Sequence, residues 1–498
     1  MGAAAARGRR VLLALGLALL VALRGCAAQG GEDGGGGSDA PAAATAPMEE
    51  KERAALYAAI EGFVGKGWNG SGLYPDPCGW SPIQGVSCDL FNGLWYPTAI
   101  SIGPVLDNSL QCAPDARFSP QLFDLRRLRT LSFYSCCPAS NPTAIPAAGW
   151  EKLSGSLETL EFRTNPGLTG AIPVSLGRLA SLQSLVLVEN NLTGPVPAEL
   201  GALLKLRRLV LSGNGLSGPI PATLGNARRH DELLIVDLSK NHLTGSLPAS
   251  LGGLRGLLKM DLSNNQLDGS IPPELGALGN LTLLDLRNNS LTGGVPQFVQ
   301  GMTSLQDLLL SNNPLGGSLP ATGWEKLSGA LATLDLSNAG LTGAIPESMA
   351  SLARLRFLAL DHNRLTGPVP AGLAELPSLG ALYLNGNNLT GALEFAPGFY
   401  RRMGRRFASW DNPGLCYDVA AVDAAHAPAG VVVCKDLQEP SVVPRDGTEE
   451  GGGRKPEASS SLAASSAVVG FSAARGGGFW SVVAVQGTVA AVLGLVLL

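Results

Sequence analysis

A segment of 24 residues recurs along the chain and constrains its fold more than any other feature. Residues 257–280 read LLKMDLSNNQLDGSIPPELGALGN, and the same pattern restarts at Leu281 and at Leu305. Met260 and Leu262 alternate with polar residues, as in a short strand that is buried on one face. One such unit cannot bury its own leucines. Successive units are therefore expected to stack into a solenoid with a continuous core.

An asparagine follows each predicted strand, where its side-chain amide is expected to satisfy backbone groups that would otherwise be buried unpaired. This position recurs every 24 to 27 residues, at Asn165, Asn190, Asn214, Asn241, Asn265, Asn289, Asn313, Ala339, Asn363 and Asn387. At Ala339 we expect a weaker or re-registered turn, with Asn338 as a poor substitute. The pattern LxxLxLxxN is the signature of the leucine-rich repeat. It predicts an α/β solenoid with short parallel strands on a concave face and irregular or 3-10 segments on a convex face.

Composition divides the chain around these repeats. Arg7, Arg9 and Arg10 precede an apolar run and then small residues, as in a secretory signal peptide. A segment rich in Pro, Gly, Ser and Glu follows the last cysteine and predicts a disordered stalk. The predicted order is signal peptide 1–28, disordered leader 29–47, N-terminal cap 48–97, about eleven repeats over 98–395, C-terminal cap 396–436 and stalk 437–471.

The chain ends in an apolar segment. Residues 479–498 are long enough to cross a bilayer as a helix. Arg475 is the last charged residue, however, whereas a membrane-spanning helix is normally followed by Lys or Arg. The pattern over residues 472–498 is typical of a glycosylphosphatidylinositol (GPI) attachment signal with Ser472 as the attachment site, and a tail-less transmembrane helix is the alternative. Either predicts a place on the extracellular face of the plasma membrane.

Secretion places the remaining seven cysteines in an oxidising environment. Four of them bracket the repeats and predict one disulfide at each end, Cys78–Cys88 and Cys416–Cys434. Cys112 is expected to pair with either Cys136 or Cys137, which leaves one thiol free. The N-glycosylation sequons lie at Asn69, Asn191, Asn280, Asn288 and Asn388. A glycan on Asn288 would restrict binding around its coil.

No motif in the sequence indicates catalysis, a cofactor or a metal. The four histidines lack metal-ligand spacing, and neither GxSxG nor a phosphate-binding loop occurs. A net charge of −4 without a basic run argues against nucleic-acid binding. Stacked acids can bind a cation or share a proton, but here we favour a structural role for the four that share an outward strand position, Asp237, Asp261, Asp285 and Asp335.

The outward strand positions form the predicted concave face, where solenoids usually bind their partners. Phe357 and Tyr383 are the expected anchors, because aromatic residues are enriched in interface hot spots; singly exposed aromatics without a role are the alternative. Arg208 also lies on this face. The candidate ligand-binding residues are Glu158, Glu161, Arg163, Arg207, Arg356, Phe357, Asp361 and Tyr383.

A longer convex segment, GWEKLSG, occurs twice, at residues 149–155 and 323–329. We expect Trp150 and Trp324 to fill a widened coil. The alternative is a pair of tryptophans that docks a partner.

Motifs at both ends resemble those of a known family. Trp68, CGW at residues 78–80 and GVSC at residues 85–88 resemble the N-terminal cap of plant extracellular leucine-rich-repeat proteins, and NPGLC at residues 412–416 resembles the start of their C-terminal cap. Overall the chain resembles plant receptor-like proteins without a kinase domain. The resemblance implies a cell-surface protein that binds a protein, peptide or glycan and signals in microbe or symbiont responses through the ectodomain of a partner receptor kinase. An extracellular inhibitor of microbial wall-degrading enzymes is the alternative, and a structural wall role is a third.

Overall fold

The computed structural model describes residues 46–104, 110–226, 232–419, 422 and 425–434. The predicted signal peptide, stalk and GPI-attachment signal, with Ser472, lie outside the described residues, as does most of the leader. Among the described residues, no helix combines the length and the apolar character needed to cross a bilayer.

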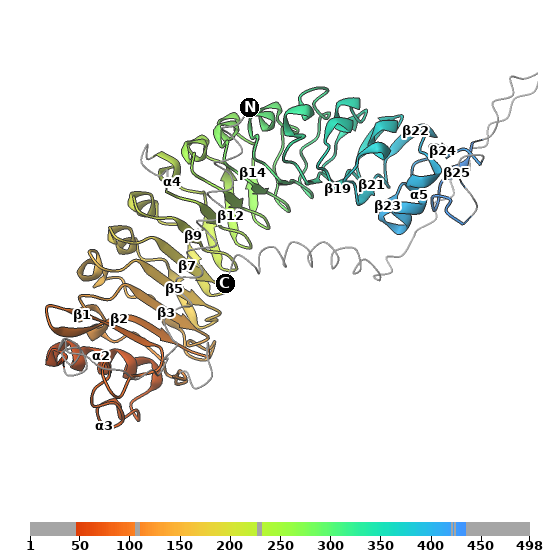
Figure 1. Ribbon diagram of the computed structural model, residues 1–498. Helices are drawn as coiled ribbons and strands as arrows, with labels where there is room; N and C mark the ends of the chain where they lie inside the picture. Colours follow the sequence, from red (N-terminus) through yellow and green to blue (C-terminus); the bar gives the residue numbers. More distant parts are fainter. Residues whose placement is uncertain (1–45, 105–109, 227–231, 420–421, 423–424, 435–498) are drawn as a thin grey trace, which may run out of the picture. The chain divides into compact units, whose positions relative to one another are not determined.

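One 14-stranded sheet runs through the repeats (Figure 1). Its first two strands are antiparallel, and each later strand is parallel to its neighbour, which confirms the predicted solenoid. The strands in sheet order are β1 (Val86–Phe91), β2 (Leu94–Ile102), β3 (Thr130–Tyr134), β5 (Thr159–Arg163), β7 (Ser184–Val188), β9 (Arg208–Val210), β11 (Ile235–Asp237), β13 (Lys259–Asp261), β15 (Leu283–Asp285), β16 (Asp307–Leu309), β17 (Thr333–Asp335), β19 (Phe357–Ala359), β21 (Ala381–Tyr383) and β23 (Phe407–Ala408).

Short helices lie on the other side of the coils (Figure 1). Most of the 3-10 helices in the repeats follow a proline, whose fixed φ suits the residue before the helix. They are η1 (Pro120–Asp124), η2 (Trp150–Leu153), η3 (Val174–Arg178), η4 (Ala198–Ala202), η5 (Ala249–Gly253), η6 (Pro273–Ala277), η7 (Gln297–Gly301), η8 (Trp324–Leu327), η9 (Glu347–Ser351) and η10 (Ala371–Glu375), with the short α-helix α4 (Thr223–Asn226) between η4 and η5.

Two further sheets, which periodicity did not predict, form where the chain turns away from the main strands. The first contains β4 (Thr143–Ala144), β6 (Leu168–Ala171), β8 (Asn191–Gly194), β10 (Gly215–Gly218), β12 (His242–Ser246) and β14 (Gln266–Asp268). The second contains β18 (Thr342–Gly343), β20 (Arg364–Gly367), β22 (Asn388–Leu393), β24 (Gly414–Tyr417) and β25 (Val432–Val433).

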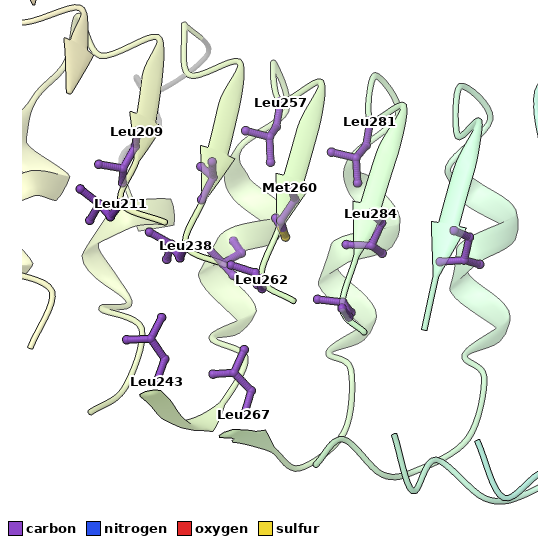
Figure 2. Packing of buried hydrophobic residues seen from close by; sticks show 14 of the residues in the cluster. Leu209, Leu211, Leu238, Leu243, Leu257, Met260, Leu262, Leu267, Leu281 and Leu284 are labelled. Carbon is purple, nitrogen blue, oxygen red and sulfur yellow. The ribbon is translucent and has the colours of Figure 1, made fainter. Parts of the chain in front are cut away.

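The core is a column of leucines repeated from coil to coil. In Figure 2, Leu257, Met260 and Leu262 of one coil point to the same side as Leu281 and Leu284 of the next, and all five side chains are buried. Burying one leucine side chain contributes about 2 kcal/mol. Because every coil supplies several such residues, stacking alone accounts for much of the stability of the solenoid.

Both ends of the solenoid are covered. At the N-terminal end, α2 (Glu50–Val64) precedes α3 (Gly70–Leu73), and the Phe63 ring stacks on Phe133 with centroids 3.9 Å apart. At the C-terminal end lie α5 (Pro397–Met403) and η11 (Gly404–Arg406). The predicted disulfides are present at these ends, Cys78–Cys88 and Cys416–Cys434.

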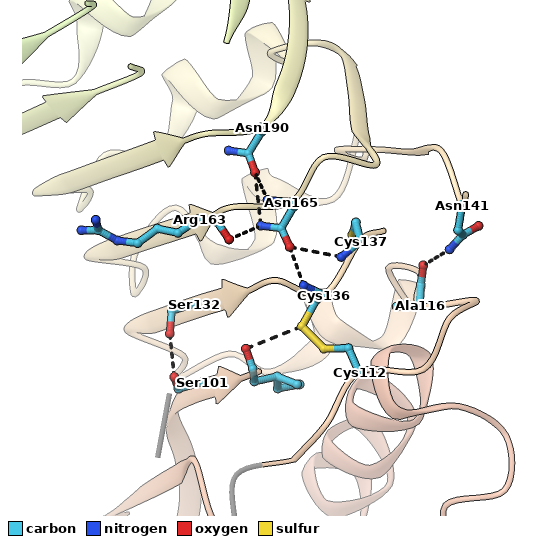
Figure 3. Close-up of a disulfide and its surroundings, with 11 residues drawn as sticks. Ser101, Cys112, Ala116, Ser132, Cys136, Cys137, Asn141, Arg163, Asn165 and Asn190 are labelled. Carbon is cyan, nitrogen blue, oxygen red and sulfur yellow. Dashed lines mark hydrogen bonds between the residues drawn. A yellow bond between two sulfur atoms is a disulfide. The ribbon is translucent and has the colours of Figure 1, made fainter. Parts of the chain in front are cut away.

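The third disulfide resolves the alternatives left by the sequence. Cys112 is bonded to Cys136, and Cys137 is a buried free thiol (Figure 3). Cys136 occupies the place of a ladder asparagine, and its backbone N–H donates to Asn165 Oδ1 at 2.7 Å. Burial raises the pKa of the Cys137 thiol to about 11.

This environment predicts that Cys137 is unreactive in the folded protein, because the thiolate is the reactive form of cysteine. Iodoacetamide at pH 8 is expected to leave the Cys137 peptide unmodified in the native chain and to alkylate it fully after denaturation, as followed by peptide mass spectrometry. Rapid alkylation of the native chain at Cys137 would contradict the buried placement.

Both tryptophans of the duplicated segment fill their coils. The exposed fraction is 0% for Trp150 and 3% for Trp324. Each indole Nε1 donates to a backbone carbonyl four residues earlier, to Pro146 at 2.8 Å and to Pro320 at 2.9 Å. The alternative of an exposed docking pair is therefore wrong.

The interruption at Ala339 changes the turn but not the strands. The strands β16, β17 and β19 keep the same register. In the preceding turn, the Leu315 N–H donates to Asn313 O at 2.8 Å, so the expected local re-registration is confirmed. The expectation for Asn338 was wrong, because its exposed side chain donates to Asn312 Oδ1 at 2.9 Å. It is one end of a second, exposed amide ladder that runs through Asn264, Asn288, Asn312 and Asn338.

Candidate functional site on the strand face

The predicted concave face is the outward surface of the 14-stranded sheet, hereafter the strand face. Side chains alternate along each strand, so the residues on either side of a buried leucine point outward. All eight candidate residues lie on this face or at its entrance, just before or after a strand. None is buried: Arg207 and Arg356 are exposed and the other six are partly exposed.

The structure divides the candidates into two groups. Glu161 and Arg163 lie on β5, whereas Phe357 lies on β19, and seven strands separate these two strands in the sheet. At roughly 4.8 Å per strand, the groups are about 38 Å apart. They cannot contact the same small ligand.

Aromatic side chains mark the late group. Phe357 on β19 and Tyr383 on β21 are in contact, with ring centroids 5.6 Å apart and an interplanar angle of 57°. Asp361 Oδ2 accepts from His362 Nδ1 at 2.8 Å, and burial raises the pKa of the Asp361 carboxyl although this hydrogen bond opposes the shift. Arg356 stands directly before Phe357 and is exposed. The group therefore combines an apolar anchor with charged neighbours, which is the composition of an interface hot spot.

Trp410 extends this group and was missed as a candidate. Its exposed fraction is 40%, and it follows β23, the strand next to β21. Trp410 was missed because the asparagine ladder continues one coil further than predicted. The Nδ2 of Asn412 donates to Leu384 O at 3.0 Å, as the ladder asparagines of the earlier coils do. The spacing of 25 residues after Asn387 was the available signal.

Charged pairs mark the early group. Arg163 forms an ion pair with Glu161 on the same strand. Arg207 pairs with Glu232 at 3.2 Å. Glu158 lies just before β5, and its backbone carbonyl accepts from Gln183 N at 2.8 Å.

Acidic residues occupy the middle of the strand face. Asp237, Asp261 and Asp285 are direct neighbours on adjacent strands. Asp261 accepts from the Ser263 hydroxyl at 2.7 Å, and Asp285 accepts from Arg287 Nη2 at 2.6 Å. These local partners support the structural role favoured above, and no cluster of three or more metal-ligating side chains occurs among the described residues.

Burial, together with the negative charges of Asp285 and Asp237, raises the pKa of Asp261 to about 7. The Ser263 hydrogen bonds oppose this shift but do not cancel it. The middle of the strand face is therefore a place where charge depends on pH near neutrality.

All five sequon asparagines have exposed side chains. Asn191 and Asn388 begin strands of the secondary sheets, Asn69 caps α3, and Asn280 precedes the strand of its coil. Asn288 lies just beyond β15, where its Nδ2 donates to Asn264 Oδ1 at 2.8 Å. A glycan there would border the strand face.

Comparisons with known proteins agree with the repeats. Family profiles for the leucine-rich repeat match residues 205–227, 232–254, 256–278, 280–302 and 329–389. The chain is 53% identical over 146 residues to Piriformospora indica-insensitive protein 2 of Arabidopsis thaliana, a match that covers 29% of this chain and 34% of that protein. It is 36% identical over 149 residues to Receptor like protein 29 of the same plant, a match that covers 29% and 31%. The chain thus matches about a third of the length of these relatives.

Among solved structures, the chain is similar to the plant peptide hormone receptor RGFR1 in complex with RGF2, with 29% identity, a TM-score of 0.49, and coverage of 60% of this chain and 50% of that chain. A TDR receptor structure has 30% identity and a TM-score of 0.49, with coverage of 60% and 58%. The profile matches and the observed coils agree on the classification. This chain contains leucine-rich repeats folded as a solenoid, and it is similar over its aligned segments to a plant receptor-like protein.

Proposed function

We propose that the protein is a receptor-like binding protein whose strand face holds a protein or peptide ligand. The observation that carries the proposal is the contact between Phe357 and Tyr383, two partly exposed aromatic rings on adjacent strands. A few hot-spot residues supply most of the binding energy in typical interfaces, and aromatic residues such as Tyr are enriched among them. The similarity to a protein named as receptor-like supports the same assignment.

The finer part of the proposal concerns signalling and location. The protein would be held at the outer face of the plasma membrane by a lipid on Ser472 and would act through the ectodomain of a partner receptor kinase. The three disulfides are consistent with passage through the secretory pathway. Phosphatidylinositol-specific phospholipase C is expected to release the protein from intact cells, with a C-terminus at Ser472 by mass spectrometry.

The test of binding is a screen of the full chain against purified plant receptor-kinase ectodomains and their peptides. Phe357→Ala is expected to weaken a detected interaction about tenfold, because it removes an interface anchor. Trp80→Ala is the control, since Trp80 is an aromatic residue with an exposed fraction of 74% that lies outside the 14-stranded sheet. No interaction, or equal loss in both variants, would count against the proposal. Inhibition of a wall-degrading enzyme without receptor binding would favour the inhibitor alternative.

A further inference from the structure

Two valines on the early part of the strand face are buried although their positions point outward. Val186 lies between the core residues Leu185 and Leu187, yet its exposed fraction is 0%. Val210, its direct neighbour on β9, has an exposed fraction of 4%. Side chains of the strand face must therefore fold over these valines and cover them.

The residues that flank the valines are charged. Glu161 on β5 is the direct neighbour of Val186 on the side opposite Val210. Arg208 begins β9, two residues before Val210. Arg163 lies two residues beyond Glu161 and forms an ion pair with it.

The two guanidinium groups are close to each other. Burial, and then the positive charge of Arg163, lower the pKa of Arg208, while Glu161 and Asp237 act in the opposite direction. The Nε of Arg208 is buried and has no hydrogen-bond partner among the described residues. A buried donor without a partner destabilises the free protein. A ligand that supplies an acceptor to this N–H would remove that cost.

The charge of this cluster indicates which ligand fits. Arg163 is paired with Glu161 and Arg207 with Glu232, so Arg208 is the one of these three arginines without an ion pair among the described residues. The carboxylates of Glu161 and of Asp237 on β11 both act on Arg208 without pairing with it. A guanidinium binds a carboxylate through two parallel hydrogen bonds. Glu161 and Asp237 on β11 would repel a phosphate group more strongly than a carboxylate, because the phosphate carries more negative charge.

We propose that Arg208, supported by Arg163, forms a subsite of the strand face that binds a single carboxylate from an acidic side chain of a peptide ligand. The inference rests on the proposed function, because it assumes that a peptide lies along this face.

The distance to the aromatic pair adds a constraint on the ligand. Five strands separate β9 from β19 in the sheet, so six strand spacings join Arg208 to Phe357. This is about 29 Å, which an extended peptide spans with about nine residues. A ligand that occupies both sites carries its acidic residue about nine positions away from its apolar residue.

The experiment uses a displayed library of random 14-residue peptides selected against the full chain. We expect recurrent peptides with Asp or Glu about nine positions from an apolar residue. Arg208→Gln and the Glu→Gln change in a selected peptide are each expected to weaken binding about tenfold, and the two together no further, because both break the same contact. Arg178→Gln on η3 is the matched control, as it removes the same charge from the opposite side of the coil.

The outcomes separate this inference from the proposed function. Selected peptides without acidic residues, or losses that multiply to about a hundredfold, would overturn the carboxylate subsite. If the binding of a selected peptide without an acidic residue is still weakened by Phe357→Ala, the proposed function stands. If neither Arg208→Gln nor Phe357→Ala weakens the binding of any selected peptide, both the carboxylate subsite and the proposed function fail. Arg208→Lys keeps the charge without the two-pronged geometry and is expected to bind about threefold more weakly, which tests the same contact should Arg208→Gln not fold.

Discussion

Replacing Asn363 by alanine is expected to lower the free energy of unfolding by about 4 kcal/mol, because the change leaves several buried backbone groups without partners. The Asn363 Oδ1 accepts from both Ala339 N and Leu341 N at 3.0 Å. Its Nδ2 donates to Leu336 O and Leu360 O at 2.9 Å. Since Ala339 already lacks a ladder amide, the variant would have two adjacent gaps.

The chain supplies its own control for this prediction. Ala339→Asn restores an amide at the interrupted position and is expected to raise the free energy of unfolding by about 1 kcal/mol, because the new amide donates to neighbouring backbone carbonyls. Urea unfolding of both variants and of the parent chain gives the comparison. An Asn363→Ala variant within about 1 kcal/mol of the parent would show that water replaces the ladder bonds.

The repeated strands follow from the sequence because one residue pattern is used many times. Each coil buries the same positions, so the period alone predicts parallel strands, and the disulfides at the two ends follow from cysteines that flank the repeats. The secondary sheets could not be predicted in this way. They depend on backbone pairing between turns such as β12 and β14, whose residues carry no distinctive alternation.

The choice between Cys136 and Cys137 also lay beyond the sequence. Both are buried and adjacent, so neither spacing nor hydropathy separates them. What decides is which side of the first coils each side chain faces. Cys136 takes the place of an inward ladder asparagine and thus reaches Cys112.

The candidate site was only partly predictable. Register identified which residues face outward, and the aromatic pair and the Glu161–Arg163 pair were among them. Which outward side chains lie over their neighbours depends on rotamers. The covered Val186 and the unpartnered Arg208 Nε are therefore features that only the structure shows.

Asparagine in place of Asp261 is expected to stabilise the fold by about 2 kcal/mol above pH 7 and to have little effect near pH 4. Burial and the charges of Asp285 and Asp237 raise the pKa of Asp261 to about 7, from an ordinary value of 3.8. Because the carboxyl holds its proton more tightly in the folded chain, the stability it contributes is present below pH 4 and is lost as pH rises through 7. The full shift corresponds to about 4 kcal/mol, which solvent contact reduces by about half.

Urea unfolding of Asp261→Asn and the parent chain at pH 4, 6 and 8 measures this difference. Asp268→Asn, which neutralises an exposed carboxylate seven residues later, controls for the loss of one charge. Equal unfolding curves for Asp261→Asn and the parent at pH 8 would show that water screens the repulsion among Asp237, Asp261 and Asp285. If the difference in unfolding free energy between Asp261→Asn and the parent grows from pH 4 to pH 8, the parent chain loses stability as Asp261 ionises. At acidic pH a ligand would then meet a less negative surface between the Arg208 subsite and the aromatic pair.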